Sequence, residues 1–282
     1  MNGLSSSLVR GAVTSPFKRA GRPGAALPAD RPTRPAAPAE PGPLAAYRRI
    51  CGFPDSGPLP LTYPHVLGFP LALRLMTGRA FPLPVVGLVH TWIEIGAHRP
   101  VQLGEPIELS VYADELTPHR RGTEVTMVTE ARVAGELVWE SRSGYLSRHA
   151  TEAAGQSEDR APAAAAAPAL PAVAEWRLPG DLGRRYGAVS GDRNPIHLHP
   201  LTARLFGFPR AIAHGMWTAA RCLAEAGEPD RIHTVRAEFR APVLLPATVT
   251  YAADPAGEAF ALRGGEGGRV HLVGRITRRQ GG

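Results

Sequence analysis

The sequence is poor in cysteine, contains a single lysine, and lacks a long apolar run. Its two cysteines, Cys51 and Cys222, lie far apart and fit neither a CxxC pair nor a Cys/His ligand spacing, so neither a disulfide framework nor a metal site is indicated. No stretch of about 18 apolar residues occurs, so we expect no membrane span. The basic N-terminal stretch has no apolar segment before a cleavage site, which argues against secretion and predicts a cytoplasmic protein.

The positive charge is concentrated at one end of the chain. Residues 1–50 hold eight Lys and Arg against two acids, whereas the other 232 residues hold 24 against 23. Because the body of the protein carries almost no net charge, a basic groove is excluded and we expect no nucleic-acid binding. The 282 residues, 44% of them hydrophobic, suffice for two small domains or one large one.

Two segments of biased composition divide the chain. Residues 1–42 are dense in Pro, Ala, Ser and Arg, and residues 150–172 form an Ala/Pro run; both are predicted to be weakly ordered. These two segments divide the chain into four predicted parts: a leader (1–42), an N-terminal unit (43–149), a linker (150–172) and a C-terminal unit (173–282).

The two units resemble each other in sequence. Similar segments occur in the same order, in three pairs: Tyr47–Gly52 with Tyr186–Gly191, Leu67–Pro70 with Phe206–Pro209, and His98–Asp114 with Arg240–Asp254. The offset is 139 residues at Tyr47 and 142 at Val101, which indicates two copies of one unit.

Periodicity within each unit predicts a helix followed by strands. Apolar residues at helical spacing predict a helix over 211–226, with Gly227 as its C-cap. Alternation and β-branched residues predict strands over 107–112, 123–128, 136–145 and 248–251. A helix followed by antiparallel strands indicates the α+β class, with the helix against one sheet face.

The segment from Tyr186 to His197 carries the strongest chemical signal. Asp192 and His197 lie five positions apart across Asn194-Pro195, which stops a helix and places the two side chains at either side of a turn. A carboxylate and an imidazole aimed at one small volume can activate a water molecule. Taken alone, such an Asp-x-Asn-Pro sequence is more often only a structural turn.

This segment resembles the hydratase motif of the MaoC-like, R-specific enoyl-CoA hydratases, which have the hotdog fold. Over residues 44–279 the chain is also similar to the actinobacterial double-hotdog 3-hydroxyacyl-thioester dehydratases. The segments that carry this similarity are Pro60–Pro64, His119–Gly122, Leu205–Pro209, Ile212–Met216 and Pro242–Pro246. The resemblance implies two tandem hotdog units, each an antiparallel sheet wrapped round a central helix.

The resemblance also implies a reaction in fatty-acid metabolism, with no cofactor. Asp192 and His197 would hold the water that adds to C3 of a trans-2-enoyl thioester, or that leaves a (3R)-hydroxyacyl thioester. The backbone N–H of Gly215 would meet the thioester oxygen, as suits a glycine at a helix N-terminus. Substrate contacts are expected from Ser190, Gly191, Asn194 and Met216, with Asn194 also fixing the turn. We interpret His214 as structural.

The N-terminal unit departs from this motif. Phe53-Pro54-Asp55 follows Gly52 where the C-terminal unit has its Asp192–His197 segment, and His65 lies ten residues beyond Asp55. The unit is therefore predicted to be non-catalytic. By analogy with the double-hotdog dehydratases that the chain resembles, loss of the polar pair would free interior volume for an acyl chain, which implies a medium or long acyl substrate.

The sequence leaves open which carrier holds the acyl group and whether the chain forms a homodimer. It also leaves two other functions open. Coenzyme A or an acyl-carrier protein would need arginines for docking; the candidates are Arg120, Arg121, Arg193, Arg204 and Arg210. Hotdog units generally pair through their sheets, so a homodimer is possible. A hotdog thioesterase and a non-enzymatic acyl-thioester-binding protein remain alternatives, against which the Asp192/His197 pair argues.

Overall fold

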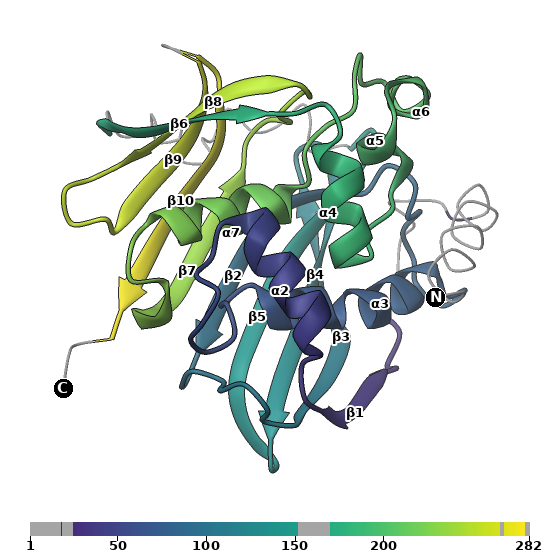
Figure 1. Cartoon of the computed structure of the whole chain (residues 1–282). Helices are drawn as coiled ribbons and strands as arrows, with labels where there is room; N and C mark the ends of the chain where they lie inside the picture. The colour runs from purple at the N-terminus through teal and green to yellow at the C-terminus, as the bar shows by residue number, and fades with distance from the viewer. Residues whose placement is uncertain (1–17, 19–24, 152–169, 266–267, 280–282) are drawn as a thin grey trace.

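The structure is a computed structural model that describes residue 18 and residues 25–151, 170–265 and 268–279. Within these residues, ten strands form one antiparallel sheet in the order β1-β3-β4-β5-β2-β7-β10-β9-β8-β6 (Figure 1). The strands of the N-terminal half are β1 (Thr33–Ala37), β2 (Val89–Ala97), β3 (Ile107–His119), β4 (Gly122–Val133) and β5 (Glu136–Arg148). Those of the C-terminal half are β6 (Ala172–Leu178), β7 (Ile232–Phe239), β8 (Ala247–Ala253), β9 (Ala259–Gly264) and β10 (Val270–Arg278).

The strand order repeats itself in the two halves. Read from the edge to the middle, the first half runs β1-β3-β4-β5-β2 and the second runs β6-β8-β9-β10-β7. The halves join where β2 pairs with β7, with Ile93 opposite Ala237 and Ile95 opposite Val235. This equivalence supports the division of the chain into two copies of one unit, although their sheets are fused into one.

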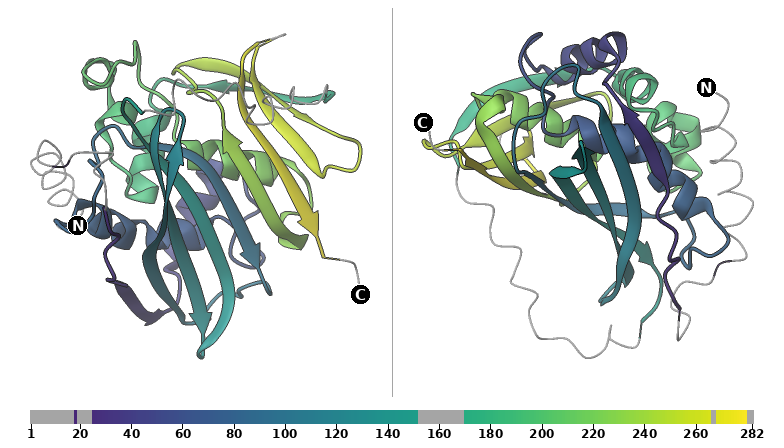
Figure 2. Two further views of the ribbon diagram at one scale, coloured as in Figure 1. Left: turned by 180° about the vertical axis from the view of Figure 1, so that it is seen from behind. Right: turned by 90° about the horizontal axis from the view of Figure 1, so that it is seen from below.

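Helices gather on one face of the sheet. The longer ones are α2 (Pro41–Cys51), α3 (Tyr63–Thr77), α4 (Leu182–Ser190) and α7 (Gly215–Glu225). The shorter ones are α5 (Pro195–Leu198), α6 (Pro200–Arg204) and the 3-10 helix η3 (Pro229–Arg231). Seen from behind, the strands lie in front of these helices (Figure 2).

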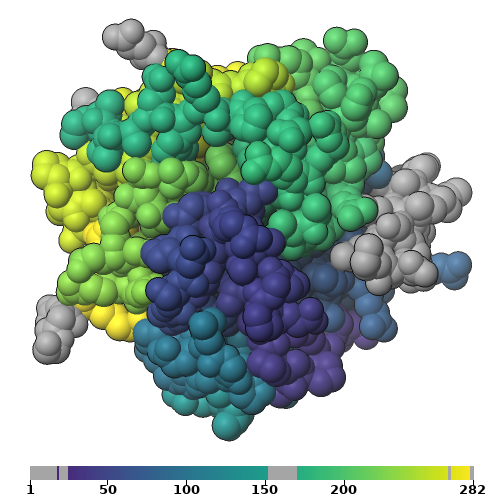
Figure 3. Space-filling view, viewed as in Figure 1, coloured from purple at the N-terminus to yellow at the C-terminus, as the bar shows by residue number. Residues whose placement is uncertain are grey.

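The core runs continuously across both halves. Tyr47 on α2 and Tyr186 on α4, the equivalent residues of the two copies, are fully buried with their ring centroids 6.3 Å apart. The indole N–H of Trp217 donates to the carbonyl of Ile50 (2.8 Å), which ties α7 to α2. In the space-filling view the purple α2 segment accordingly lies against the green segments of the C-terminal half (Figure 3). Each half thus contributes to the burial of the other.

Strand β1 corrects the expected extent of the leader. Residues Thr33–Ala37 pair with β3, so the N-terminal unit begins at least ten residues before residue 43. The Pro- and Arg-rich composition concealed this strand because an edge strand, with one side unpaired, tolerates Pro35. Most of the remaining leader and of the predicted linker lies outside the described residues.

The helix predicted over 211–226 begins later, at Gly215. Ala213 N–H instead donates to the carbonyl of Val243 (2.9 Å), and Ile212 forms a bridge with Leu244. These contacts hold residues 211–213 extended beside the chain that leads into β8. Among the described residues, no helix is long and apolar enough to cross a membrane.

Candidate active site

The loop between α4 and α5 is held by a series of short-range hydrogen bonds. Helix α4 ends at Gly191, whose φ of 77° lies in the left-handed region that favours glycine. The Oγ atom of Ser190 accepts a hydrogen bond from the Asp192 N–H (3.2 Å). In the same way, Asp192 Oδ1 accepts a hydrogen bond from the Asn194 N–H (3.1 Å), and Asn194 Oδ1 accepts one from the Ile196 N–H (3.3 Å). The last bond caps α5, which begins at Pro195. These contacts assign Ser190, Gly191 and Asn194 to positioning the loop.

Two glycines of α4 let this loop approach the helix closely. A Cβ atom on Gly183 would lie 1.9 Å from the carbonyl oxygen of His197, and one on Gly187 would lie 2.7 Å from that of Asp192. Both distances are shorter than any van der Waals contact. The loop therefore rests directly on the backbone of α4, and the glycines fix the positions of the carboxylate and the imidazole.

His197 is buried, and its ring orientation is determined by one hydrogen bond. Its Nδ1 lies 2.8 Å from the carbonyl oxygen of Ile212. A carbonyl only accepts, so Nδ1 carries the proton and Nε2 has a free lone pair. Burial lowers the pKa of His197, outweighing the opposite effects of Asp192 and the Ile212 carbonyl. The imidazole is thus a neutral base at pH 7.

His214 belongs to the same cluster, and its interpretation as a purely structural residue missed this. Its ring stacks on that of His197 at 3.6 Å between centroids. Its Nε2 donates to the Asp192 carbonyl (2.9 Å) and lies 3.8 Å from Asp192 Oδ2. Burial, then the neighbouring His197, lower its pKa to about 3, so it too is neutral. No signal in the sequence pointed to this, because the helix was predicted to begin before His214, at residue 211.

The N-terminus of α7 opens beside this cluster without a side-chain cap. Gly215 is its first residue and Met216, half-buried, its second. Unpaired N–H groups at a helix N-terminus attract an anion or a developing oxyanion. A Cβ atom on Gly215 would lie 3.0 Å from the Phe239 ring, so glycine also suits this crowded position.

Comparisons with known proteins identify the family of this chain. Residues 173–261 match the family model described as MaoC like domain. The chain is 39% identical over 245 residues to "3-hydroxyacyl-thioester dehydratase X" of Mycobacterium tuberculosis, covering 85% of this chain and 86% of that protein. This chain belongs to the MaoC-like dehydratase family.

Solved structures confirm the predicted double hotdog. The crystal structure of HtdX from M. tuberculosis superposes with a TM-score of 0.75 at 34% identity, covering 89% of this chain and all of that one. A second M. tuberculosis protein, described as having a double hotdog fold, superposes with a TM-score of 0.52 and covers 90% of this chain and 98% of its own. At 15% identity the second likeness concerns the fold alone.

The N-terminal copy of the MaoC-like fold has a different loop after its equivalent helix. Arg48 stands at the position equivalent to Gly187, and its buried guanidinium donates to four loop carbonyls, those of Pro54, Ser56, Gly57 and Pro58. His65, on α3, bonds to Ser141 Oγ (3.2 Å). Asp55 and His65 therefore do not reproduce the arrangement of Asp192 and His197.

Asp192 and His197 of this MaoC-like chain, together with His214, also have the composition of a metal site. One ligand atom from each of Asp192, His197 and His214 lies within 4.8 Å of the others. Two of the ring nitrogens donate to backbone carbonyls and so have no lone pair for a metal. Each imidazole keeps one ring nitrogen with a lone pair, Nε2 of His197 and Nδ1 of His214, and the latter is buried without a hydrogen-bond partner among the described residues.

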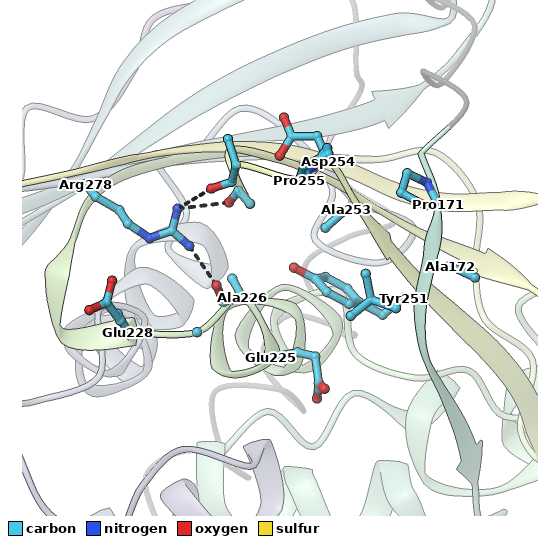
Figure 4. Close-up of a pocket in the computed structure, with 14 residues that line it drawn as sticks. Pro171, Ala172, Glu225, Ala226, Glu228, Tyr251, Ala253, Asp254, Pro255 and Arg278 are labelled. Carbon is cyan, nitrogen blue, oxygen red and sulfur yellow. Dashed lines mark hydrogen bonds between the residues drawn. The ribbon is translucent and has the colours of Figure 1, made fainter.

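A hollow of the MaoC-like fold lies elsewhere, at one end of α7 (Figure 4). It measures about 690 Å³, and Arg278 on its wall donates to the carbonyls of Ala226, Ala256 and Gly257. Tyr251 and the carboxylates of Glu225, Glu228 and Asp254 also line it. Its lining contains no histidine, so it offers no equivalent of the Asp192/His197 pair.

Three of the five arginines predicted to dock the carrier lie near the pair in sequence. Arg193 is inside the loop itself, while Arg204 and Arg210 donate to the carbonyls of Pro209 and Pro246. Arg120 and Arg121 lie at the turn between β3 and β4. All five are exposed, so each is accessible to a phosphate or to an acidic surface.

Proposed function

We propose that this protein is a hydro-lyase that interconverts (3R)-3-hydroxyacyl thioesters and trans-2-enoyl thioesters. The observation that carries the proposal is the free Nε2 of a buried, neutral His197 beside the carboxylate of Asp192. Family membership supports it, since the M. tuberculosis relative is named a 3-hydroxyacyl-thioester dehydratase. A protein that only binds acyl thioesters has no need of such a pair.

In the hydration direction, Asp192 and His197 hold one water molecule against C3 of the enoyl thioester. His197 Nε2 accepts a proton from the water while its oxygen forms the bond to C3. The C2=C3 π electrons move toward the thioester carbonyl, whose oxygen gains negative charge. The protonated His197 then gives this proton to C2, which completes the addition of H₂O and restores the neutral imidazole, and dehydration is the reverse sequence.

The thioester oxygen would lie at the N-terminus of α7. There the backbone N–H of Gly215 donates to it, and the helix dipole stabilises its developing charge. Because these groups are fixed by the fold before substrate arrives, they need no reorganisation during the reaction. Asn194, Ser190 and Gly191 hold the loop, and Met216 lies beside the oxyanion position.

The test is a hydration assay on purified protein. With crotonyl-CoA and longer trans-2-enoyl-CoA substrates, we expect loss of the conjugated enoyl absorbance and formation of the (3R) product. Release of free coenzyme A without hydration would identify a thioesterase, and binding without any reaction would identify a binding protein. The same chain-length series on coenzyme A and acyl-carrier-protein thioesters tests the expected preference for medium or long acyl groups and identifies the carrier.

A further inference from the structure

An exposed apolar cluster follows the loop that holds Asp192 and His197. It consists of Leu201 on α6 and of Leu205 and Phe206 in the turn after this helix, three of the six large apolar side chains that the described residues expose. Leu201 and Leu205 are 63% and 81% exposed and lie one helical turn apart, on one side of the chain. Figure 1 shows α6 beyond α5, at the edge of the molecule. Apolar side chains gathered in this way mark an interaction surface.

The internal repeat shows that the fold does not require this exposure. Leu67–Pro70 of the N-terminal copy corresponds to Phe206–Pro209, so Leu67 is the counterpart of Phe206. Leu67 lies within α3 and packs against the core. Phe206 instead lies beyond the end of the short helix α6 and is exposed. The exposed cluster is therefore a feature of the copy that contains the Asp192/His197 pair.

Arginines without acidic partners accompany the cluster. Residues 193–224 contain no aspartate or glutamate. Arg193, Arg204 and Arg210 are exposed, and none of them forms an ion pair within the described part of the chain. The guanidinium groups of Arg204 and Arg210 donate to backbone carbonyls, which leaves their charges unpaired. These arginines and the apolar cluster, together called the α6 surface, combine positive charge with exposed apolar area.

The α6 surface is connected to both segments of the candidate active site. Thr202 Oγ1 donates to the carbonyl of Pro195 (2.7 Å), which holds α6 against the helix that carries His197. At the other end of the surface, Arg210 directly precedes the extended residues 211–213 that lead to Gly215. A partner bound to the α6 surface would therefore lie beside the segments that hold the imidazole and the N-terminus of α7.

We propose that the α6 surface is the docking site of an acidic acyl-carrier protein, which delivers the acyl thioester to Asp192 and His197. This inference rests on the proposed function, because it names the carrier that presents the substrate of that reaction. The carboxylates of the carrier would pair with the arginines, and its apolar side chains would cover Leu201, Leu205 and Phe206.

Other occupants fit only one of the two properties of the α6 surface. The phosphates of coenzyme A pair with arginines but leave the leucines in water. A second copy of this chain in a symmetric contact would bring arginines against arginines, because residues 193–224 contain no acid. An acidic protein with an apolar centre satisfies the charges and buries the apolar cluster at the same time.

The decisive variant is Leu205→Ser, which makes the most exposed apolar side chain of the cluster polar. We expect kcat/KM for a trans-2-enoyl group on an acyl-carrier protein to fall about tenfold, through KM, because docking no longer buries this side chain. Hydration of the same acyl group on coenzyme A should be unchanged. Leu103→Ser is the matched control, since Leu103 is exposed in the turn between β2 and β3 and should affect neither substrate.

Charge reversal tests the arginines of the α6 surface. Arg204→Glu should raise KM for the carrier-protein thioester about tenfold and weaken the dependence of kcat/KM on NaCl, because charges at the rim of an interface act on association. Arg275→Glu on β10 makes the same change in net charge at another exposed position. It should leave KM and the dependence on NaCl as in the wild type.

An equal loss on both thioesters in Leu205→Ser, or no loss on the carrier-protein thioester, overturns the inference. A wild-type dimer that Leu205→Ser converts to a monomer would assign the surface to a second copy, and binding to anionic phospholipid vesicles that Leu205→Ser abolishes would assign it to a membrane. If the wild type hydrates no enoyl thioester, the proposed function fails. The affinities of wild type and Leu205→Ser for butyryl-carrier protein, measured by calorimetry, still decide whether the carrier docks here.

Discussion

At the scale of single residues, the tautomer of His197 is the feature on which the chemistry depends. The Ile212 carbonyl accepts a hydrogen bond from the Nδ1–H of His197, and the stacked His214, neutral because it is buried, adds no charge to the site. His214 also holds the backbone of Asp192 through Nε2. The imidazole that reacts is therefore oriented by two neighbours that do not titrate near pH 7.

Asp192→Asn and His197→Ala should each reduce turnover by at least about 10²-fold, the scale of a lost general acid or base. Steady-state hydration rates measure the effect, with circular dichroism to show that the fold is kept. His199→Ala is the matched control from the same loop: it removes an exposed N-cap of α6 and should cost about 1 kcal/mol of stability while turnover is kept. A variant at Asp192 or His197 with full turnover would remove that residue from the mechanism.

At the scale of elements, α4 works as a platform for the catalytic loop. Its glycines at 183 and 187 lie one turn apart and face the loop carbonyls of His197 and Asp192. The position of the reactive groups is thus determined by the absence of two side chains. The two glycines are therefore explained by the close contact between the helix backbone and the loop, and not by helix propensity.

Gly183→Ala should displace the loop, because its Cβ would overlap the His197 carbonyl oxygen. We expect kcat to fall more than about tenfold and stability to fall by about 1–3 kcal/mol, as for other overpacked sites. Gly42→Ala on α2 has nothing within 4 Å of its Cβ and should be neutral or slightly stabilising. Hydration rates and urea unfolding measure both effects; a Gly183→Ala enzyme with normal kcat would contradict the close packing.

The sequence indicated those elements that depend on local patterns. The repeat at Tyr47 and Tyr186, the turn at Asn194-Pro195 and the strands beginning near Ile107 and Glu136 all agree with the structure. These features depend on residues close together in the chain, so spacing and turn chemistry suffice to predict them.

Features that depend on distant contacts could not be predicted in this way. Strand β1 exists because β3 offers it an edge, and α7 begins late because residues 211–213 bond to residues 243–245. His214 joins the site because its ring stacks on His197 and its Nε2 donates to the Asp192 carbonyl, contacts between α7 and the loop after α4. No local pattern contains that information.

At the scale of the whole molecule, the two halves share one sheet, one core and a set of buried histidines. His65, His90 and His214 lie at or near the junction, and burial is the main cause that lowers their pKa values to about 4, 3 and 3. Each therefore stays neutral in the folded protein at pH values where the unfolded chain binds a proton. Acid should destabilise the fold through these residues.

The unfolding free energy should be highest above pH 6.5 and fall as the pH decreases toward 4. Each of these histidines contributes a loss of about 1.4 kcal/mol per pH unit, because its folded pKa lies below the unfolded value. Urea unfolding between pH 7.5 and 4.5 measures the slope. His90→Phe, which keeps an aromatic ring at this position, should reduce the slope by the amount that one histidine contributes. An unaltered slope in His90→Phe would contradict the burial of a neutral imidazole.

The guanidinium of Arg48 makes the divergence of the two copies difficult to reverse. Introducing an aspartate and a histidine after Gly52 would not create a second active site, because four carbonyls of that loop are folded round the arginine. Replacing Arg48 by glycine, as at position 187, would leave those carbonyls without their donor. Restoring an Asp/His pair in the N-terminal copy therefore requires several changes at once, each of which would destabilise the protein if made alone. Under the proposed function, the molecule would have one reaction centre per chain, and the N-terminal copy would be free to specialise in the shape of the acyl site.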